Sequence, residues 1–189
     1  MQFLLFIVFA YLLGSIPFGK LVGRMYGIDI QKKGSRNIGF TNSLRTLGLK
    51  PAIFVLLGDM LKGLMPTKIS LEYLSLNQAL IVAAVAILAH IFPVWLKFKG
   101  GKGIATGLGA ILAINPLIAV IAIILFFIVF LATKIVSISS IIATGSLLFV
   151  SYFVSPKTTI FYLCLFIIVV LTHRENISRL IKGTEKRLI

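Results

Sequence analysis

The sequence predicts an all-α integral membrane protein, a single bundle of seven transmembrane helices with the N-terminus outside and the C-terminus in the cytoplasm. Composition is the first reason: the 189 residues are 59% hydrophobic and 13% charged, whereas a soluble domain is about 45–50% apolar and about 25% charged. The second reason is the placement of 19 Lys and Arg against 5 Asp and Glu, a net charge of +14. In a soluble protein this surplus would suggest nucleic acid as a partner, but in membrane proteins Lys and Arg gather in cytoplasmic loops.

Six apolar segments are long enough to cross the hydrocarbon core, which takes about 20 helical residues, with shorter spans tolerated. They cover residues 3–22, 51–66, 78–96, 117–133, 137–154 and 158–172. A seventh segment, 104–115, is short and is closed by Asn115-Pro116. The first segment has no basic residue before it and no clear cleavage site, so we expect a retained span and not a signal peptide.

Charge decides whether 104–115 is a span of its own. If it is, 16 basic residues face the cytoplasm and only Lys68 and Lys157 lie outside. If 104–133 were one helix, Lys134 and the five basic residues of the tail would move outside, and the bias would largely vanish. The positive-inside rule therefore favours seven spans. We expect one domain, residues 1–189, with no internal repeat and no linker.

The longest loop is expected at residues 23–50, in the cytoplasm, and within it GSRNIGFTNSLRTLG (34–48) combines glycines and two arginines with hydroxyl and amide side chains. The hydroxyl and amide residues are Ser35, Asn37, Thr41, Asn42 and Ser43. Glycines let backbone N–H groups approach a ligand, hydroxyls and amides donate hydrogen bonds, and Arg45 can hold a phosphate through two parallel bonds. A solvated loop of turn residues is the alternative, and the density of donors favours anion binding.

A second motif, KFKGGKGIATG (97–107), precedes the short span. It is not a P-loop, because Lys102 is followed by Gly103 and the upstream glycine is missing. A glycine turn that opens a helix still directs unpaired N–H groups, and the positive end of the helix dipole, towards a phosphate held by Lys102. Close helix packing through Gly103, Gly107 and Gly109 explains the glycines equally well, and the two explanations are compatible.

Asp59 and Lys62 lie three residues apart inside the second span, on one helix face. Charges at this depth are costly and rarely idle, and we expect a structural ion pair ahead of a proton or substrate pathway. His90 and His173 have no second ligand at helical spacing, so no metal is expected. Each could act as a base or orient a substrate, although an ordinary polar contact is the commoner role of a lone histidine.

These patterns predict a cytoplasm-facing site that is rich in phosphate-binding groups and poor in nucleophiles. The single cysteine, Cys164, lies in an apolar run, and no Ser-His-Asp set is evident. Direct transfer between two bound substrates is therefore favoured over a covalent acyl-enzyme.

The sequence closely resembles a known family, the bacterial membrane-integral glycerol-3-phosphate acyltransferases that use acyl phosphate as donor (PlsY). Five elements carry the resemblance in the family's order and spacing, and they cover essentially the whole chain: GSIPFG (14–19), GSRNIGFTNSLRTLG (34–48), GDMLKG (58–63), GGKGIATG (100–107) and HRENISRLIKGTEKR (173–187). The His-x4-Asp motif of the other large acyltransferase family is absent. One departure is Lys134-Ile135-Val136 before Ser137, where the family tends to have Arg and Tyr.

The resemblance implies transfer of a fatty acyl group from acyl phosphate to the 1-hydroxyl of sn-glycerol 3-phosphate, without a cofactor or acyl carrier protein. It implies a multi-pass protein of the bacterial cytoplasmic (inner) membrane whose partners are the two substrates and the bilayer. The site would face the cytoplasm. We expect a monomer that binds no nucleic acid.

Site roles follow from the same resemblance. Substrate phosphates would be held by Ser35, Arg45, Lys97 and Lys102. Close backbone approach and polar donors would come from the site-shaping residues Asn37, Thr41, Gly101, Gly103 and His90. The catalytic residues would be His173, Asn176, Ser137 and Lys102, with either His173 or a substrate phosphate oxygen accepting the hydroxyl proton.

Two other classes of protein fit parts of the sequence. A transporter or flippase for an anionic phosphate compound would suit intramembrane Asp59 and Lys62 and the half-helix at 104–115, but no inverted repeat is evident and the polar groups gather at one face. A structural bundle whose basic loops bind anionic lipids would leave the interleaved Ser, Asn and Thr donors unexplained.

Overall fold

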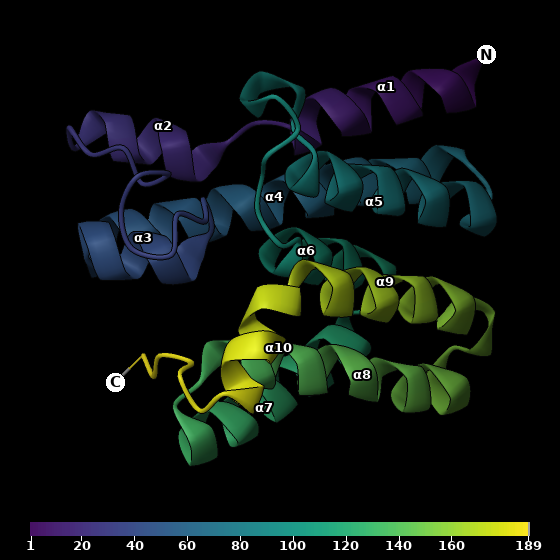
Figure 1. Cartoon of the computed structure of the whole chain (residues 1–189). Coiled ribbons are helices and arrows are strands. Elements are labelled where there is room, and N and C mark those ends of the chain that lie inside the picture. The colour runs from purple at the N-terminus through teal and green to yellow at the C-terminus, as the bar shows by residue number, and fades with distance from the viewer. Residues whose placement is uncertain (189) are drawn as a thin grey trace. The chain divides into compact units, whose positions relative to one another are not determined.

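The computed structural model describes residues 1–188, and within them every regular element is a helix (Figure 1). The chain forms two compact units, Met1–Ile114 and a second one from Asn115 onward. The first contains α1 (Gln2–Gly14), α2 (Phe18–Met25), α3 (Phe40–Leu47), α4 (Leu49–Tyr73), α5 (Leu76–Ile91), the short 3₁₀ helix η1 (Val94–Leu96) and α6 (Ile104–Ile114). The second contains α7 (Pro116–Thr133), α8 (Val136–Val154), the 3₁₀ helix η2 (Pro156–Thr158), α9 (Thr159–Thr172) and α10 (Arg174–Ile181).

Among the described residues, four helical stretches are long and apolar enough to cross a membrane: Gln2–Met25, Leu76–Leu96, Pro116–Thr133 and Val136–Val154. A fifth candidate is the pair Pro156–Thr172 and Arg174–Ile181, which bends by 62° between its two parts. Helix α4 has 25 residues but carries five charged side chains, and α6 is a shorter apolar helix. The all-helical class is confirmed, whereas the count of seven spans and the direction of the termini stay predictions.

Helix boundaries follow local chemistry. Helix α1 ends at Gly14 because Pro17, with no N–H and a fixed φ, interrupts the predicted 3–22 segment before α2 begins. Helices α6 and α7 are distinct, as the charge argument required: Asn115 adopts an extended backbone, and its side chain accepts a hydrogen bond from the N–H of Ile118. Pro116 then occupies the first position of α7, where a missing N–H costs nothing.

The prediction of one continuous loop over 23–50 is wrong. Residues 40–47 form α3, and α2 extends to Met25. The cause is amphipathic: in FTNSLRTL the side chains of Asn42 and Ser43 are buried while Arg45 is exposed. A short helix with one polar face and one packed face has no long apolar run, so hydropathy alone does not reveal it.

Small residues let the helices of the first unit approach closely. A Cβ atom added to Gly63 of α4 would lie 2.0 Å from the carbonyl oxygen of Thr106 in α6, and one added to Gly109 would lie 2.0 Å from the carbonyl oxygen of Met60. Glycine at both positions therefore permits backbone contact between α4 and α6, as is usual for helices packed in lipid. Helix α1 packs on α5 in the same way, through Ala10 and Ala86.

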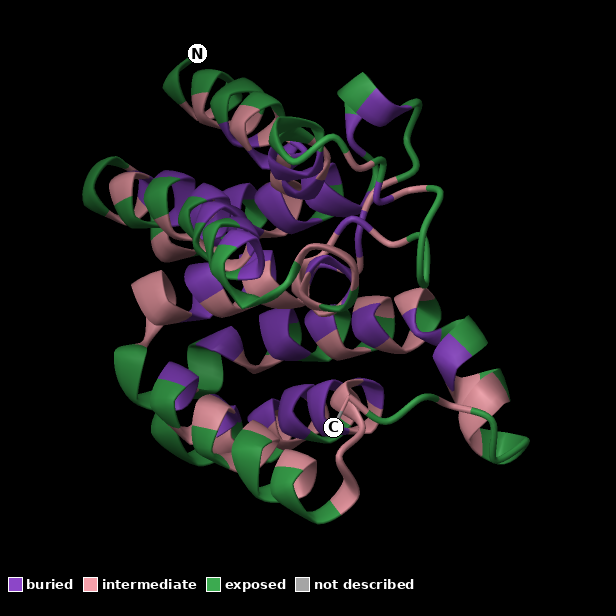
Figure 2. Ribbon diagram, turned by 90° about the vertical axis from the view of Figure 1, so that its left-hand side faces the viewer, coloured by how far each residue is buried: buried purple, intermediate pink, exposed green. Residues whose placement is uncertain are grey.

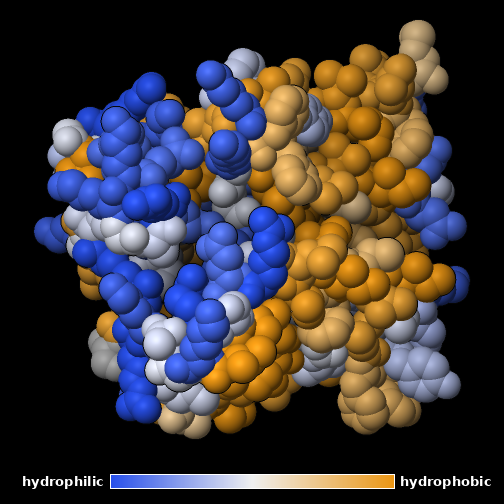
Figure 3. All heavy atoms as spheres, viewed as in Figure 1, coloured by the Kyte–Doolittle hydropathy of each residue, from blue (hydrophilic) through white to orange (hydrophobic). Residues whose placement is uncertain are grey.

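Apolar and polar surfaces of the first unit are separated along its length. Figure 3 shows hydrophilic side chains gathered over α2 and α3, and hydrophobic side chains over α1 and α5. The N-terminal helix is exposed over most of its length and buried towards its C-terminal end (Figure 2). An exposed apolar flank next to a charged end is the arrangement expected of a unit that sits in a bilayer with α2 and α3 near the water.

The second unit buries a row of hydroxyl side chains along α8. Ser139, Ser140 and Thr144 each donate to the backbone carbonyl four residues earlier, at 2.7–2.9 Å. Every one of these hydroxyls is thereby satisfied within its own helix, which is a requirement in hydrocarbon. Helix α8 packs against α9, whose buried residues include Tyr162 and Leu165.

Candidate active site

The motif at 34–48 is organised around one buried amide, that of Asn42 at the start of α3. Its Oδ1 accepts from the N–H of Ser35 at 2.8 Å. Its Nδ2 donates to the carbonyl oxygens of Ile30, Lys33 and Asn37 at 3.0, 3.1 and 2.8 Å. The Asn42 side chain is 1% exposed, so it holds the loop together from inside and is no ligand donor, contrary to the expectation that it would face an anion.

The other polar residues of this motif differ in exposure and in their hydrogen bonds. Ser35 and Arg45 are exposed, and Asn37 and Thr41 are half-buried. Asn37 Oδ1 accepts from the N–H of Gly39 at 2.9 Å, which turns the chain into α3. Ser43 is fully buried and donates to the Gly39 carbonyl. Ser35 and Arg45 are therefore the groups of this motif best placed to meet a ligand.

The second motif reverses direction after η1 and runs back along the end of α5. Lys97 and Phe98 both have left-handed backbones, with φ of 52° and 62°, a conformation that costs energy in residues with side chains. Phe98 N–H donates to the Pro93 carbonyl at 3.0 Å, and Gly100 N–H to the Ile91 carbonyl at 3.0 Å. Lys97 is exposed and Lys102 half-buried, just before α6 begins.

An apolar cluster joins the two motifs. Ile30 and Ile38 of the first loop pack with Leu96 of η1, and all three are buried. A cavity of about 290 Å³ opens beside Leu96, bordered by Lys20 and Arg24 of α2 and by Trp95. The structure thus brings the Ser35–Arg45 and Lys97–Lys102 segments onto one packed core, at the hydrophilic end of the first unit.

Three ionisable side chains, those of Asp59 and Lys62 in α4 and His90 in α5, are buried in the same unit. Lys62 Nζ is 2.7 Å from Asp59 Oδ1, and His90 Nδ1 is 3.5 Å from the same oxygen. All three residues are at most 3% exposed. Lys62 also donates to the carbonyl of Ile16 at 2.8 Å, in the break between α1 and α2.

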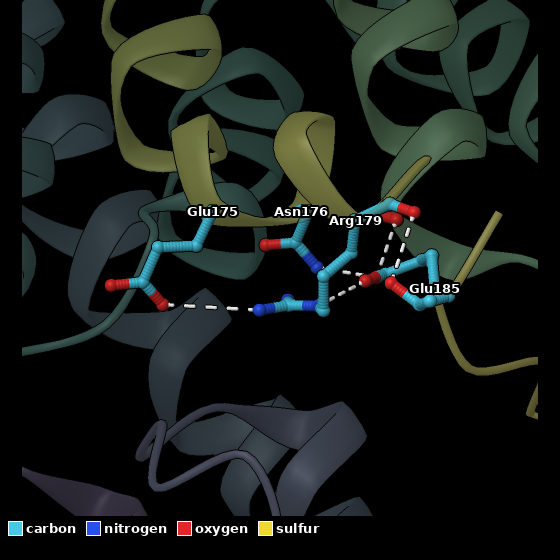
Figure 4. Close-up of polar contacts among 6 residues, drawn as sticks. Glu175, Asn176, Arg179 and Glu185 are labelled. Atoms are coloured by element: carbon cyan, nitrogen blue, oxygen red, sulfur yellow. Dashed lines mark hydrogen bonds and ion pairs between the residues drawn. The ribbon is translucent and has the colours of Figure 1, made fainter. Parts of the chain in front are cut away.

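The second unit gathers its polar side chains around one carboxylate, Glu185. Its Oε1 accepts from Ser137 Oγ at 2.8 Å and from the amide of Asn176, and its Oε2 accepts from Arg179 Nε at 2.6 Å. Figure 4 shows Asn176 and Arg179 directed at Glu185, with Glu175 on the other side of the arginine. Two expected catalytic residues, Ser137 and Asn176, are therefore held in place by a carboxylate.

Glu185 titrates abnormally for a defined reason. Burial raises the pKa of its carboxyl, but hydrogen bonds from Asn176, Arg179 and Ser137, with the positive charge of Arg179, outweigh burial and hold the pKa below the usual 4.5. The group is therefore ionised at neutral pH. The chain end returns to the same unit through the Leu188 N–H, which donates to the Lys134 carbonyl at 2.9 Å.

His173 caps α9 and is 3% exposed. Its Nδ1 lies 2.8 Å from the Val169 carbonyl oxygen. A carbonyl only accepts, so Nδ1 carries the hydrogen, and in the neutral ring the basic nitrogen is Nε2. This tautomer is the one that a proton-accepting Nε2 requires.

Sequence reasoning did not single out Glu185, Arg179 or the inward role of Asn42. The sequence did contain a signal for Glu185. The chain has only five acidic residues against 19 basic ones, and an acidic residue within a basic tail is expected to pair with a neighbouring cation. In the part of the chain that the structure describes, no group of three His, Cys, Asp or Glu side chains is placed to hold a metal ion.

These features define a class: a helical integral membrane protein with glycine-rich, basic motifs at one end of its first unit. The chain belongs to the glycerol-3-phosphate acyltransferase family, whose pattern matches residues 4–183. A glycerol-3-phosphate acyltransferase of Trichlorobacter lovleyi is 43% identical over 97% of this chain and 96% of its own. One of Fusobacterium nucleatum is 42% identical over 99% and 98%, and one of Aquifex aeolicus 36% over 99% and 100%.

Solved structures agree with the sequence matches. The crystal structure of PlsY (YgiH), an integral membrane glycerol 3-phosphate acyltransferase, in its glycerol 3-phosphate form, superposes with a TM-score of 0.95 and 34% identity, covering 99% of this chain and 96% of that one. The lysophosphatidic acid form of the same protein gives a TM-score of 0.93. The chain is therefore an acyltransferase of the membrane-integral type, and the resemblance noted in the sequence is confirmed.

Proposed function

We propose that the protein transfers a fatty acyl group from acyl phosphate to the 1-hydroxyl of sn-glycerol 3-phosphate. The products are 1-acyl-sn-glycerol 3-phosphate (lysophosphatidic acid) and inorganic phosphate, in the first acylation of phospholipid synthesis. The observation that carries the proposal is the match over nearly the whole chain to a structure described in glycerol 3-phosphate and lysophosphatidic acid forms. These two compounds are the acceptor and the product of the proposed reaction.

The chemistry is a direct acyl transfer. The hydroxyl oxygen of glycerol 3-phosphate attacks the carbonyl carbon of acyl phosphate, a new ester C–O bond forms, and the bond to the phosphate oxygen breaks with its electron pair leaving on phosphate. The hydroxyl proton passes to His173 Nε2 or to a phosphate oxygen of a substrate. Because phosphate is a good leaving group, the enzyme has mainly to align the reactants and stabilise developing negative charge.

Cationic and backbone donors of the first unit suit the anionic parts of both substrates. We assign Ser35, Arg45, Lys97 and Lys102 to the phosphate groups, with Asn37, Thr41, Gly101 and Gly103 shaping the site. Lys102 also stabilises charge as the bond to phosphate breaks. Three of these residues, Ser35, Arg45 and Lys97, are exposed, as a group that meets a soluble substrate must be.

His173, Asn176 and Ser137 of the second unit are assigned to the hydroxyl that is acylated. The Ser137 hydroxyl donates its hydrogen to Glu185, so towards a substrate its oxygen acts as an acceptor. Held in this way, Ser137 can orient the attacking hydroxyl.

The site residues are tested by comparing Arg45→Ala with Lys32→Ala. Both are exposed cations, Arg45 on α3 and Lys32 in the loop that precedes this helix, and the printed ion pair of Lys32 is a 3.9 Å contact with Asp29. A charge-assisted hydrogen bond contributes about 1.5–3 kcal/mol, so Arg45→Ala should raise the KM for glycerol 3-phosphate on the order of 10–100-fold, while Lys32→Ala leaves it unchanged. Equal kinetics for the two variants would remove Arg45 from the site.

We further propose a monomeric, seven-span protein of the bacterial cytoplasmic membrane, with an active site that faces the cytoplasm. The charge distribution supports this topology, since it puts 16 basic residues on one side. Single cysteines introduced at Lys134 and Lys157 in a Cys164→Ser background test it with a membrane-impermeant thiol reagent on intact cells. Labelling at 157 and not at 134 is expected, and the reverse pattern or labelling at both would contradict the topology.

A further inference from the structure

Asp59, Lys62 and His90 form a buried network that the reaction chemistry does not use. Taking a carboxylate and an ammonium out of water costs several kcal/mol each, and an apolar pair of similar volume often stabilises a protein as well or better. Such a network in a membrane-embedded unit therefore calls for a role other than bulk stability. Its contacts at either end indicate what that role is.

One end of the network holds the break between α1 and α2. Lys62 Nζ donates to the Ile16 carbonyl at 2.8 Å and lies 5.9 Å from the centre of the Phe18 ring. The same Nζ is 2.7 Å from Asp59 Oδ1. Lys62 is thus fixed by three partners from two segments.

The other end reaches the glycine turn of the second motif. The Nδ1 edge of His90 faces Asp59, at 3.5 Å from Oδ1. The opposite edge faces Gly101: a Cβ atom there would lie 2.0 Å from His90 Nε2 and 2.8 Å from Cε1. The turn is also tied to the backbone of α5, since the Gly101 N–H donates to the His90 carbonyl at 3.1 Å.

We propose that His90 is a positioning residue for the reaction: its ring, held by the Asp59–Lys62 pair, is the spacer that sets the position of the Gly100–Gly103 turn and thereby of Lys102. The ring fills the space that a side chain at 101 would take, so the turn rests on it directly. Lys102 follows Gly101 and precedes α6, so its backbone is placed by this contact. The inference rests on the proposed role of Lys102 at a substrate phosphate.

Two near-isosteric variants separate support of the turn from simple pairing with Asp59. The amide nitrogen of Asn takes the place of Nδ1, facing Asp59, and that of Gln takes the place of Nε2, facing Gly101. His90→Gln should keep most of the activity. His90→Asn should lose at least tenfold in kcat/KM for glycerol 3-phosphate at the same unfolding temperature, because displacement of a binding group by about 1 Å can cost on the order of 10²-fold. Thr67→Val, a substitution of a buried polar residue in the neighbouring helix α4, is the matched control and should leave kcat/KM unchanged.

Hydrogen exchange gives a readout independent of catalysis. In His90→Asn the amides of residues 97–103 should exchange faster than in the wild type, while those of α5 before residue 88 should not. If both His90 variants fail to fold, Gly101→Ala tests the contact from the turn, where full activity would overturn the proposal. Equal activity of the Asn and Gln variants, or Asn the more active, would also overturn it. The wild type could show no transferase activity while residues 97–103 still exchange faster in His90→Asn than in the wild type. This result would refute the proposed function, and the His90 ring would still be the spacer that supports the glycine turn.

Discussion

Replacing Asn42 by alanine should open the loop of residues 30–39. Asn42 accepts one hydrogen bond, and its two amide hydrogens are shared among three carbonyls. Counting one bond for each hydrogen, the variant loses three hydrogen bonds at about 1 kcal/mol each, about 3 kcal/mol in all. Thr46→Val removes a single bond, from Thr46 Oγ1 to the Asn42 carbonyl at 2.8 Å, and should cost about 1 kcal/mol. Since about 1.4 kcal/mol is a factor of ten, the open population should rise about 100-fold in the first variant and about fivefold in the second.

Trypsin measures this opening directly, because Lys32, Lys33 and Arg36 all lie in the loop. Cleavage of a transiently opened segment follows its equilibrium population when closing is faster than cutting. Purified protein in detergent is digested at low protease concentration, and cleavage in the loop is followed by mass spectrometry. Equal cleavage rates for Asn42→Ala and Thr46→Val, or cleavage of both no faster than that of the wild type, would contradict this role of Asn42.

Three further predictions concern other elements. Glu185 has a folded-state pKa below its value of 4.5 in the unfolded chain, so its contribution to stability is present above about pH 5 and is lost as the pH falls through the folded-state pKa. In thermal unfolding from pH 7 to pH 3, the unfolding temperature of Glu185→Gln should therefore fall less with acid than that of the wild type. Parallel curves of unfolding temperature against pH would contradict this. Gly63→Ala should lower the unfolding free energy by about 1–3 kcal/mol through overpacking against the Thr106 carbonyl, and an unchanged unfolding temperature would mean that α4 and α6 are not in backbone contact. Asn115→Ala removes the cap on the Ile118 N–H and should cost about 1 kcal/mol, with Asn115→Asp restoring it; no difference between the two would remove the cap from the account.

Much of the fold can be predicted from hydropathy and from the residues that end or begin helices. The apolar runs after Leu76, Pro116 and Val136 are helices in the structure, and Asn115-Pro116 separates α6 from α7 as expected. Helix α3 was not predicted, because its buried polar residues hydrogen-bond to the backbone of the loop before it and leave no apolar run in the sequence. The second predicted span, 51–66, extends to Tyr73 as α4, since Pro66 does not end the helix.

The site is less predictable than the fold, because residue types do not reveal which way a side chain faces. Ser35 and Asn42 are similar polar residues of one motif, yet the first is exposed and the second is buried among backbone carbonyls. Glu185 collects donors from three positions that are 6 to 48 residues away in the sequence, and no local pattern encodes that separation. Contacts of this kind follow from tertiary packing, and only the structure supplies them.

A stoichiometric assay of the purified protein in lipid tests direct acyl transfer to glycerol 3-phosphate. Acyl phosphate and glycerol 3-phosphate are added together and separately, and inorganic phosphate and lysophosphatidic acid are quantified over time. The two products should appear in equal amounts and only when both substrates are present. Phosphate released without glycerol 3-phosphate, or no lysophosphatidic acid with both substrates present, would contradict direct acyl transfer.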